Sequence, residues 1–196
     1  EREIMYDRYI EKIINISERD PLTRVLNRQG FNEKIRRLIS NSDKDKKLGI
    51  IYLDIDKLKQ INDKYGHKIG DKAITNVVNI LTANLRERDI IARMGGDEFV
   101  IVVEEISGST STAYGLAKRL LKAVSKVKGE KYSTTLSIGV HIFKAGKFLK
   151  DAENEEKFFK KWEKEINECD KAAYASKEAG RNRVSVSPDF SKNYKL

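Results

Sequence analysis

The spacing of apolar positions predicts four helices within residues 29–173. The clearest covers residues 69–86, where an apolar residue recurs every four positions and gives the helix one apolar face. Similar spacing predicts helices over residues 29–40, from Leu116 to Val127, and from Phe158 to Ala173. Each of these helices is expected to pack one face against a shared core.

Short apolar runs rich in β-branched residues predict the strands between these helices. Residues 48–55 (LGIIYLDI) are typical of a buried central strand. Residues 90–93 and 99–103 flank a glycine pair, which predicts a β-hairpin with a tight turn. Further strands are expected at residues 134–143 and 184–186. Helices alternating with a sheet that contains a hairpin predict an α/β sandwich with a mixed sheet.

The first 19 residues are charged and carry apolar residues at helical spacing. Two stripes fit the spacing, one through Tyr6, Ile10 and Ile13 and the other through Tyr9, Ile13 and Ile16. Either stripe suits a short coiled coil or an amphipathic helix that packs on its own domain. Asp20-Pro21 ends this helix, because proline disfavours helical geometry in the preceding residue. We therefore divide the chain into a linker or signalling helix at residues 1–19 and one domain at residues 20–196.

Composition narrows the class of partner. The chain has 196 residues with a net charge of +9 and a pI near 9.4, so an anionic partner such as nucleic acid, membrane or nucleotide phosphate is expected. The single cysteine, Cys169, excludes an internal disulfide framework and a cysteine-based zinc site. No apolar run is long enough to span a bilayer. We expect a cytoplasmic piece of a longer protein, whose missing N-terminal region could carry a membrane anchor.

Two carboxylate clusters mark the candidate chemistry. Asp54 and Asp56 lie at the end of the central strand, and Asp97 and Glu98 lie on the glycine turn of the hairpin. If the hairpin lies beside the central strand, Asp54 and Asp97 converge, and facing carboxylates repel unless a cation lies between them. Hard oxygen ligands favour Mg²⁺ or Mn²⁺, which commonly also binds substrate phosphates. The alternative for Asp54 or Asp56 alone is a helix N-cap or a solvated loop.

Basic residues follow the same pattern. Lys59 comes directly after the first carboxylates, where the N–H groups of a short helix could cradle a phosphate. Lys177 and Arg181 are four residues apart, and share a helix face if the last helix continues to Gly180 and beyond. Taken alone, such lysines and arginines are more often solvated surface charge, and a glycine pair is more often only a turn.

Five strings, in order and spacing, identify a family resemblance. Residues 95–99 spell GGDEF, preceded by Arg93, and residues 86–89 form an RxxD motif five residues before Gly95. The other strings are DPLTRVLNR at residues 20–28, DID through GD at residues 54–71, and SIGV at 137–140 with the segment from Lys177 to Val184. Over residues 20–186 the chain resembles the GGDEF-domain diguanylate cyclases of bacterial signalling.

The resemblance implies a fold and a reaction. The fold would be ferredoxin-like, akin to polymerase palms and nucleotidyl cyclases. The reaction would join two GTP into cyclic di-GMP and release two pyrophosphates. Each domain would supply half a site, so turnover would need a two-fold homodimer. An upstream sensor would control that pairing through the N-terminal helix.

The resemblance also assigns roles by position. Asp54, the Ile55 carbonyl and Asp97 would hold Mg²⁺ or Mn²⁺ against the GTP triphosphate. Asp97 would also activate the ribose 3′-hydroxyl, and Glu98 belongs to the same signature. The substrate-binding positions are Asn62 and Asp71 for the guanine edge, Leu58 and Lys59 for the phosphate stretch, and Lys177 and Arg181 for the triphosphate. A carboxylate accepts from the N1–H and amino group of guanine, and adenine offers no such pair of donors.

The RxxD motif implies product inhibition. Arg86 and Asp89 would bind cyclic di-GMP, with a second contact from Arg119 or Lys118. The alternative is a surface ion pair at a helix end. Three features depart from the family pattern: Leu58 replaces a usual Phe, Met94 replaces an often aromatic residue, and residues 143–168 form a longer, more charged stretch. Within that stretch, Phe158 and Trp162 are predicted to be core.

Two other functions stay open from the sequence. The first is a non-catalytic GGDEF domain that binds GTP or cyclic di-GMP as a sensor, although a pure binder does not need the metal carboxylates. The second, from charge alone, is a nucleic-acid-binding module. The chain lacks a basic helix with base-reading side chains and an aromatic stacking platform, which argues against nucleic acid.

Overall fold

The computed structural model describes residues 17–106, 111–126, 132–151 and 154–194. The helix predicted over residues 1–19 lies almost wholly outside the described residues. Its choice between a coiled coil and a packed amphipathic helix therefore stays a prediction, as does the domain boundary at residue 20.

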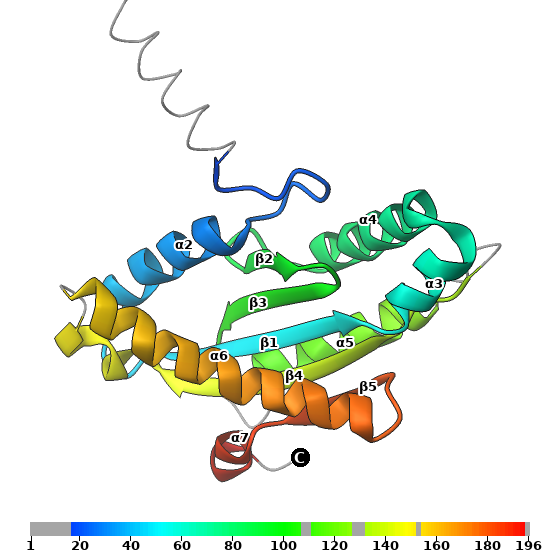
Figure 1. Ribbon diagram of the computed structural model, residues 1–196. Coiled ribbons are helices and arrows are strands. Elements are labelled where there is room, and N and C mark those ends of the chain that lie inside the picture. The colour runs from blue at the N-terminus through cyan, green and yellow to red at the C-terminus, as the bar shows by residue number, and fades with distance from the viewer. Residues whose placement is uncertain (1–16, 107–110, 127–131, 152–153, 195–196) are drawn as a thin grey trace, which may run out of the picture.

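A five-stranded mixed sheet forms the centre of the fold (Figure 1). Its order is β2-β3-β1-β4-β5, from strands β1 (Lys47–Ile55), β2 (Ile90–Gly95), β3 (Glu98–Glu104), β4 (Leu136–Lys144) and β5 (Arg183–Val186). The central strand β1 pairs antiparallel with β3 and β4, and β5 runs parallel to β4. The predicted hairpin and mixed sheet are confirmed.

Helices cover both faces of this sheet (Figure 1). One face carries α2 (Arg28–Ser40) and α6 (Glu155–Glu178), and the other carries α3 (Leu58–Tyr65), α4 (His67–Ala83) and α5 (Thr112–Ser125). The short helix α7 (Pro188–Asn193) packs Phe190 into the second of these layers. Two 3-10 turns, Ala145–Lys147 and Leu149–Asp151, connect β4 to α6.

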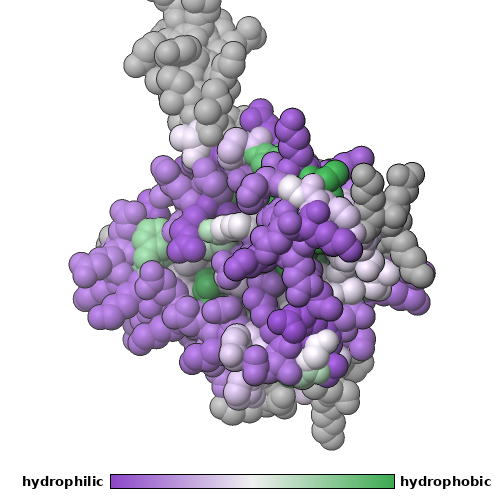
Figure 2. Space-filling model, turned by 45° about the vertical axis from the view of Figure 1, so that its right-hand side comes forward, coloured by the Kyte–Doolittle hydropathy of each residue, from purple (hydrophilic) through white to green (hydrophobic). Residues whose placement is uncertain are grey.

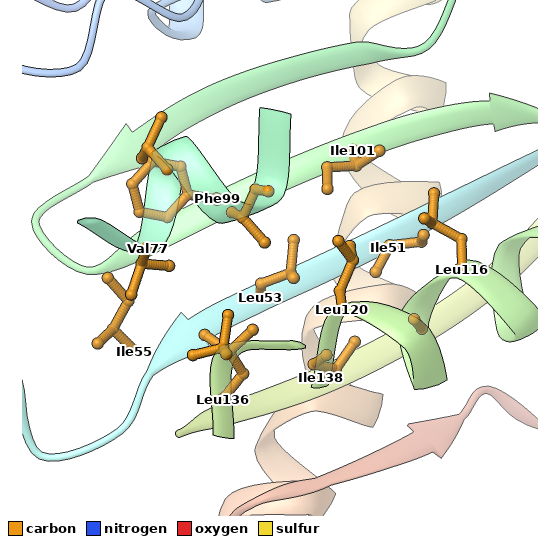
Figure 3. Close-up of a cluster of buried hydrophobic side chains, with 14 of the residues drawn as sticks. Ile51, Leu53, Ile55, Val77, Phe99, Ile101, Leu116, Leu120, Leu136 and Ile138 are labelled. Carbon is orange, nitrogen blue, oxygen red and sulfur yellow. The ribbon is translucent and has the colours of Figure 1, made fainter. Parts of the chain in front are cut away.

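The alternation of side chains along β1 separates two cores. Successive side chains of a strand point to opposite faces. Ile51, Leu53 and Ile55 pack against α4 and α5, as the close-up in Figure 3 shows. Ile50 and Tyr52 pack toward α2 and α6. The same alternation turns Asp54 toward the α2–α6 face, within reach of the C-terminal end of α6, and Asp56 follows directly after the strand.

Aromatic side chains fill the core beneath α6. Trp162 packs against Phe31, Phe143 and Phe148 at ring-centroid distances of 5.8, 5.7 and 6.4 Å. Phe158 is fully buried against Phe148. The prediction that Phe158 and Trp162 are core residues is confirmed. The charged 143–168 stretch thus serves to extend the hydrophobic layer on this face.

The structure corrects several predicted boundaries. The single helix expected over residues 69–86 is preceded by a separate helix, α3, and Gly66 at φ 84° divides α3 from α4. Helix α4 ends at Ala83, so Arg86 lies beyond it. The helix α7 was not predicted, because six residues are too few for apolar periodicity. Its local signal is Ser187 at the N-cap followed by a proline.

His141 anchors a buried polar network that the sequence left without a role. Its ring nitrogens lie 2.7 Å from Ser187 Oγ and 2.7 Å from Glu165 Oε2. Lys147 Nζ lies 3.2 Å from the other oxygen of Glu165. Burial acts to raise the pKa of Glu165, but the bonds from His141 and the charge of Lys147 hold it below its ordinary value. The network fastens β4, α6 and the start of α7 together.

Candidate active site

The two predicted carboxylate clusters meet at one edge of the sheet. Asp54 lies opposite Glu98 in the register of β1 with β3. The N–H of Ile55 donates to the carbonyl of Asp97 at 3.1 Å, which fixes the hairpin turn beside the end of β1. The geometry thus brings Asp54, Asp97 and Glu98 together, as the hairpin predicted.

Lys177 completes this cluster from helix α6. Its Nζ donates to Asp54 Oδ2 at 2.6 Å. Burial acts to lower the pKa of Lys177, but the bond to Asp54 and the charges of Asp54, Asp97 and Glu98 raise it above its ordinary value. Lys177 therefore stays a cation beside three carboxylates.

The Asp54 carboxyl is electrostatically perturbed. Burial raises its pKa to about 6, Lys177 opposes that rise, and the charges of Asp97 and Asp56 add to it. A carboxylate in this position gains from any further cation, since burial and repulsion both disfavour its ionised form. Glu98 has a related effect nearby: burial first and the Glu98 charge second raise the pKa of Tyr52.

The donor set decides which cation the edge could hold. Asp54, Asp97 and the Ile55 carbonyl supply hard oxygen ligands of the kind Mg²⁺ prefers. Among the described residues, no group of three or more His, Cys, Asp or Glu side chains could hold a metal ion by itself. Mg²⁺ needs only one or two carboxylates when phosphates and waters complete its shell. The residues therefore fit Mg²⁺ that arrives with a phosphate ligand.

Asp56, predicted as a partner of Asp54, has a different environment. Its Oδ2 accepts from Thr135 Oγ1 at 2.6 Å, and its Oδ1 accepts from Ser137 Oγ at 2.6 Å. The N–H of Asn182 donates to Oδ2 at 3.2 Å. Both carboxylate oxygens are engaged within the protein, so Asp56 does not belong with Asp54 in a metal-binding pair.

The last helix does not continue to Gly180, so the condition under which Arg181 would share a helix face with Lys177 is not met. Helix α6 ends at Glu178, and Arg181 lies in the following loop with φ 65°. Lys177, in the last turn of the helix, is the residue that reaches Asp54. Arg181 is exposed at the same edge, because its neighbour Asn182 is bonded to Asp56.

The predicted phosphate stretch begins helix α3. Lys57 is its N-cap, with left-handed backbone at φ 61°, and Leu58 is its first residue. Lys59 is exposed, whereas the side chain of Leu58 is buried in the core. Only the backbone of Leu58 is therefore available to a phosphate, while Lys59 offers its ammonium group.

The expected guanine readers lie on the adjoining helices α3 and α4. Asn62 packs against Gly70 so closely that a Cβ on this glycine would lie 1.7 Å from Asn62 Oδ1. Asp71, the next residue, is exposed on α4. The bare glycine thus allows Asn62 to lie beside the segment that carries Asp71.

Arg93 makes contacts that the sequence did not predict. Its guanidinium donates to the Gly96 carbonyl at 2.7 and 3.1 Å and to Asp20 at 3.0 and 3.2 Å. Asp20 also accepts from the N–H and hydroxyl of Thr23. Burial acts to raise the pKa of Asp20, but these bonds hold it below its ordinary value. The DPLT string thereby contacts the GGDEF turn, and the signal for it in the sequence is an arginine two residues before the glycine pair.

The RxxD residues lie beyond α4. Asp89 Oδ2 accepts from the backbone N–H of Arg86 at 2.8 Å, which closes the turn. Arg119 of α5 donates to the carbonyl of Asn84 at 2.8 Å and so lies near this turn, whereas Lys118 lies over the Tyr114 ring. Of the two candidates for a second contact, Arg119 has the fitting position.

The surface is charged and mixed. Figure 2 shows a largely hydrophilic face with small, separate hydrophobic spots. Within the described part of the chain, no helix has the length and apolar character needed to cross a membrane.

The comparisons with known proteins all point to the same family. The profile described as "Diguanylate cyclase, GGDEF domain" matches residues 17–183. Probable diguanylate cyclase DgcT of Escherichia coli is 33% identical over 178 residues, and diguanylate cyclase A of Treponema denticola is 35% identical over 159 residues. These matches cover 88% and 79% of this chain but only 36% and 39% of the relatives. The chain thus spans less than half the length of these curated relatives.

Solved structures show the same fold. The coiled coil and GGDEF domain of DgcB from Caulobacter crescentus, in complex with c-di-GMP, matches with a TM-score of 0.75 at 26% identity, covering 95% of this chain and 94% of that chain. Diguanylate cyclase SiaD of Pseudomonas aeruginosa, in complex with its activator SiaC, matches at 0.74 and 26% identity, covering 95% and 67%. The predicted palm-like sheet flanked by helices is confirmed.

Proposed function

The chain belongs to the GGDEF-domain diguanylate cyclase family, and from this premise we propose that it condenses two GTP into cyclic di-GMP with release of two pyrophosphates. The observation that carries the proposal is the cluster of Asp54, Asp97 and Glu98 around Lys177. Such a cluster suits phosphoryl transfer, because the carboxylates can hold a metal ion and the lysine can stabilise the negative charge that develops on the phosphates.

The reaction forms a bond between each ribose 3′-oxygen and the α-phosphorus of the other GTP. The bond from that phosphorus to the β-phosphate bridging oxygen breaks, and pyrophosphate leaves with its electron pair. Asp97 would accept the 3′-hydroxyl proton, and Glu98 follows it in the chain at the start of β3. When bound, Mg²⁺ held by Asp54, the Ile55 carbonyl and Asp97 supplies charge neutralisation at the phosphates.

Substrate binding follows from the residues around this edge. Lys177 offers a positive charge to the triphosphate, as do Lys59 and Arg181. The Asn62 amide and the Asp71 carboxylate can pair with the guanine edge, which favours GTP over ATP. Neither space nor backbone conformation explains the glycine at position 96. No atom lies within 4 Å of where its Cβ would stand, and its φ is not positive. The fold therefore has room for a side chain at Gly96, and a close-approaching substrate is a reason to omit one.

Each chain would supply half of the site. Two domains with their edges facing across a two-fold axis would bring both 3′-oxygens to both α-phosphates. Arg86 and Asp89 would bind the product and reduce turnover. A sensor region elsewhere in the full protein would control pairing, and the cytoplasm, which supplies GTP, is the expected location.

The decisive test is product formation by the purified chain. It would be incubated with GTP and Mg²⁺, alone and fused to a dimerising segment, and the nucleotides separated by chromatography. Asp97→Asn serves as the matched control, since it keeps the shape but removes the base. Cyclic di-GMP from the parent alone supports the enzyme. No cyclic di-GMP at any concentration, even with forced pairing, refutes the activity, and binding of GTP or cyclic di-GMP without turnover would favour the sensor alternative.

A further inference from the structure

Asp56 has the sequence position of a metal ligand but the contacts of a structural clamp. We propose that Asp56 is a positioning residue for substrate binding: its carboxylate holds the loop after α6 so that Arg181 meets the phosphates of GTP. The proposal rests on the proposed function, because it assumes that the edge of the sheet binds a nucleotide triphosphate.

Three segments distant in sequence converge on this carboxylate. Asp56 follows β1 directly and is 3% exposed. Thr135 and Ser137, at the start of β4, each donate a hydroxyl at 2.6 Å. The N–H of Asn182 donates from the loop between α6 and β5 at 3.2 Å. The backbone N–H of Asp56 also donates to the Thr135 carbonyl at 2.9 Å. The carboxylate therefore ties the loop to the end of β1 and the start of β4.

The loop needs such a tie, because its backbone is strained. Arg181 at φ 65° and Asn182 at φ 46° are consecutive non-glycine residues in the left-handed region, which L side chains adopt only at a steric cost. Such conformations persist only where the surroundings over-determine them. Gly180, at φ 109°, begins the turn that follows α6, and the N–H of Arg181 donates to the Ser176 carbonyl at 3.0 Å. On the far side of Arg181, the bond from Asn182 to Asp56 ties the loop to the sheet, while Arg183 Nε donates to the Arg181 carbonyl at 3.1 Å within the loop itself.

This restraint acts on the peptide that joins Arg181 to Asn182. Fixing the Asn182 N–H fixes the plane of that peptide, and with it the direction in which the Arg181 side chain leaves the backbone. Lys177, one turn earlier on α6, is fixed by Asp54 at 2.6 Å. Two carboxylates at the end of β1, Asp54 in the strand and Asp56 just after it, thus hold Lys177 through its side chain and Arg181 through the backbone of the next residue.

The same bonds argue against a metal at Asp56. Hydroxyl and amide donors engage both of its oxygens, so a metal ligand would have to give up bonds from two segments. Asp54 differs, since its side chain pairs with the ammonium group of Lys177, which sits at the end of a flexible side chain. A neutral amide at position 56 can keep an oxygen toward Asn182, while the Thr135 and Ser137 hydroxyls can turn to accept or donate.

Binding of 3′-deoxy-GTP with Mg²⁺ tests the proposal, because this analogue has no 3′-hydroxyl and cannot be cyclised. The dissociation constant would be measured by calorimetry for the parent, Asp56→Ala, Arg181→Ala and the double variant. We expect Asp56→Ala and Arg181→Ala each to weaken binding roughly tenfold, the loss of one charge-assisted bond. In the Arg181→Ala background, Asp56→Ala should add less than about twofold. Ser137→Ala, which removes a donor from the oxygen away from Asn182, is the control and should stay within about twofold of the parent.

Fully additive losses in the double variant, or unchanged binding by Asp56→Ala, would overturn the positioning role. If Asp56→Ala does not fold, the isosteric pair Asp56→Asn and Asp54→Asn decides. Asp56→Asn should bind 3′-deoxy-GTP with Mg²⁺ nearly as the parent does, whereas Asp54→Asn should not. Equal loss in both would assign Asp56 to the metal and overturn the proposal. Absence of binding by the folded parent would instead overturn the proposed function, and the positioning role with it.

Discussion

Replacing Asp54 by asparagine should stabilise the fold while removing its cation site. The folded state holds Asp54 with a pKa of about 6 against 3.8 for an unperturbed carboxyl. A folded pKa above the unfolded one favours folding at low pH, and this advantage is lost as pH rises from about 4 through 6. Two pKa units correspond to about 3 kcal/mol, and because the paired Lys177 side chain is 32% exposed, water screens roughly half of that. Ionised Asp54 therefore costs the fold about 1–2 kcal/mol at pH 7.5.

Urea unfolding in EDTA measures this cost. We expect Asp54→Asn to raise the free energy of unfolding by about 1–2 kcal/mol at pH 7.5, and by roughly a third of that at pH 4.5, where folded Asp54 is largely protonated. The amide oxygen can still accept from Lys177, so packing is retained. Asp63→Asn, on an exposed residue of α3, is the matched control and should show no such pH dependence.

Two results would refute the electrostatic reasoning. One is destabilisation by Asp54→Asn at pH 7.5, which would mean that the pairing with Lys177 outweighs burial and repulsion. The other is an equal gain at both pH values, which would mean that the effect is not protonation of this carboxyl. Adding 3′-deoxy-GTP and Mg²⁺ should reverse the order of stability, because only the parent retains the anionic ligand for the cation.

Three further substitutions probe the rest of the site. Gly70→Ala should displace Asn62 and weaken GTP binding roughly tenfold without lowering the free energy of unfolding, since alanine is the better helix former; equal GTP affinity in a competition assay would contradict this. Arg86→Ala should raise the cyclic di-GMP concentration needed for half-inhibition at least tenfold and leave the initial rate unchanged, and an unaltered inhibition curve would argue against a product site there. Arg93→Ala should lower the turnover rate about tenfold by freeing the Gly96 carbonyl, with Arg93→Lys intermediate; a parental rate for Arg93→Ala would show that the turn needs no such support.

Local pattern was enough for the architecture. The apolar run that became β1 and the hairpin strands were recognisable because a buried strand needs apolar residues on both faces. Phe158 and Trp162 were assigned to the core from helical spacing alone, and the structure buries both. Helix ends were less accurate, because they depend on caps such as Gly66 and Ser187, which carry only one or two residues of signal.

The site could be predicted from the sequence where its residues come from neighbouring strands. Asp54 and Asp97 could be paired because a hairpin beside the central strand brings their ends together. Arg181 was misplaced because the end of α6 at Glu178 is set by the loop beyond it. The bridge from Arg93 to Asp20 was missed because it joins residues 73 positions apart.

The sequence by itself therefore determined the order of the strands and the main helices, the family resemblance, and the meeting of Asp54 with Asp97 and Glu98 at the edge of the sheet. Only the tertiary structure separated Asp54 from Asp56. The two carboxylates lie two residues apart at the end of β1, but Asp56 meets donors 79, 81 and 126 positions away, while Asp54 meets a lysine 123 positions away. A carboxylate bonded to fixed hydroxyl and amide donors has a structural role. A carboxylate paired with a flexible ammonium group stays available to a ligand. Such partners are assembled by packing, so no local pattern around residues 54–56 could have told the two apart.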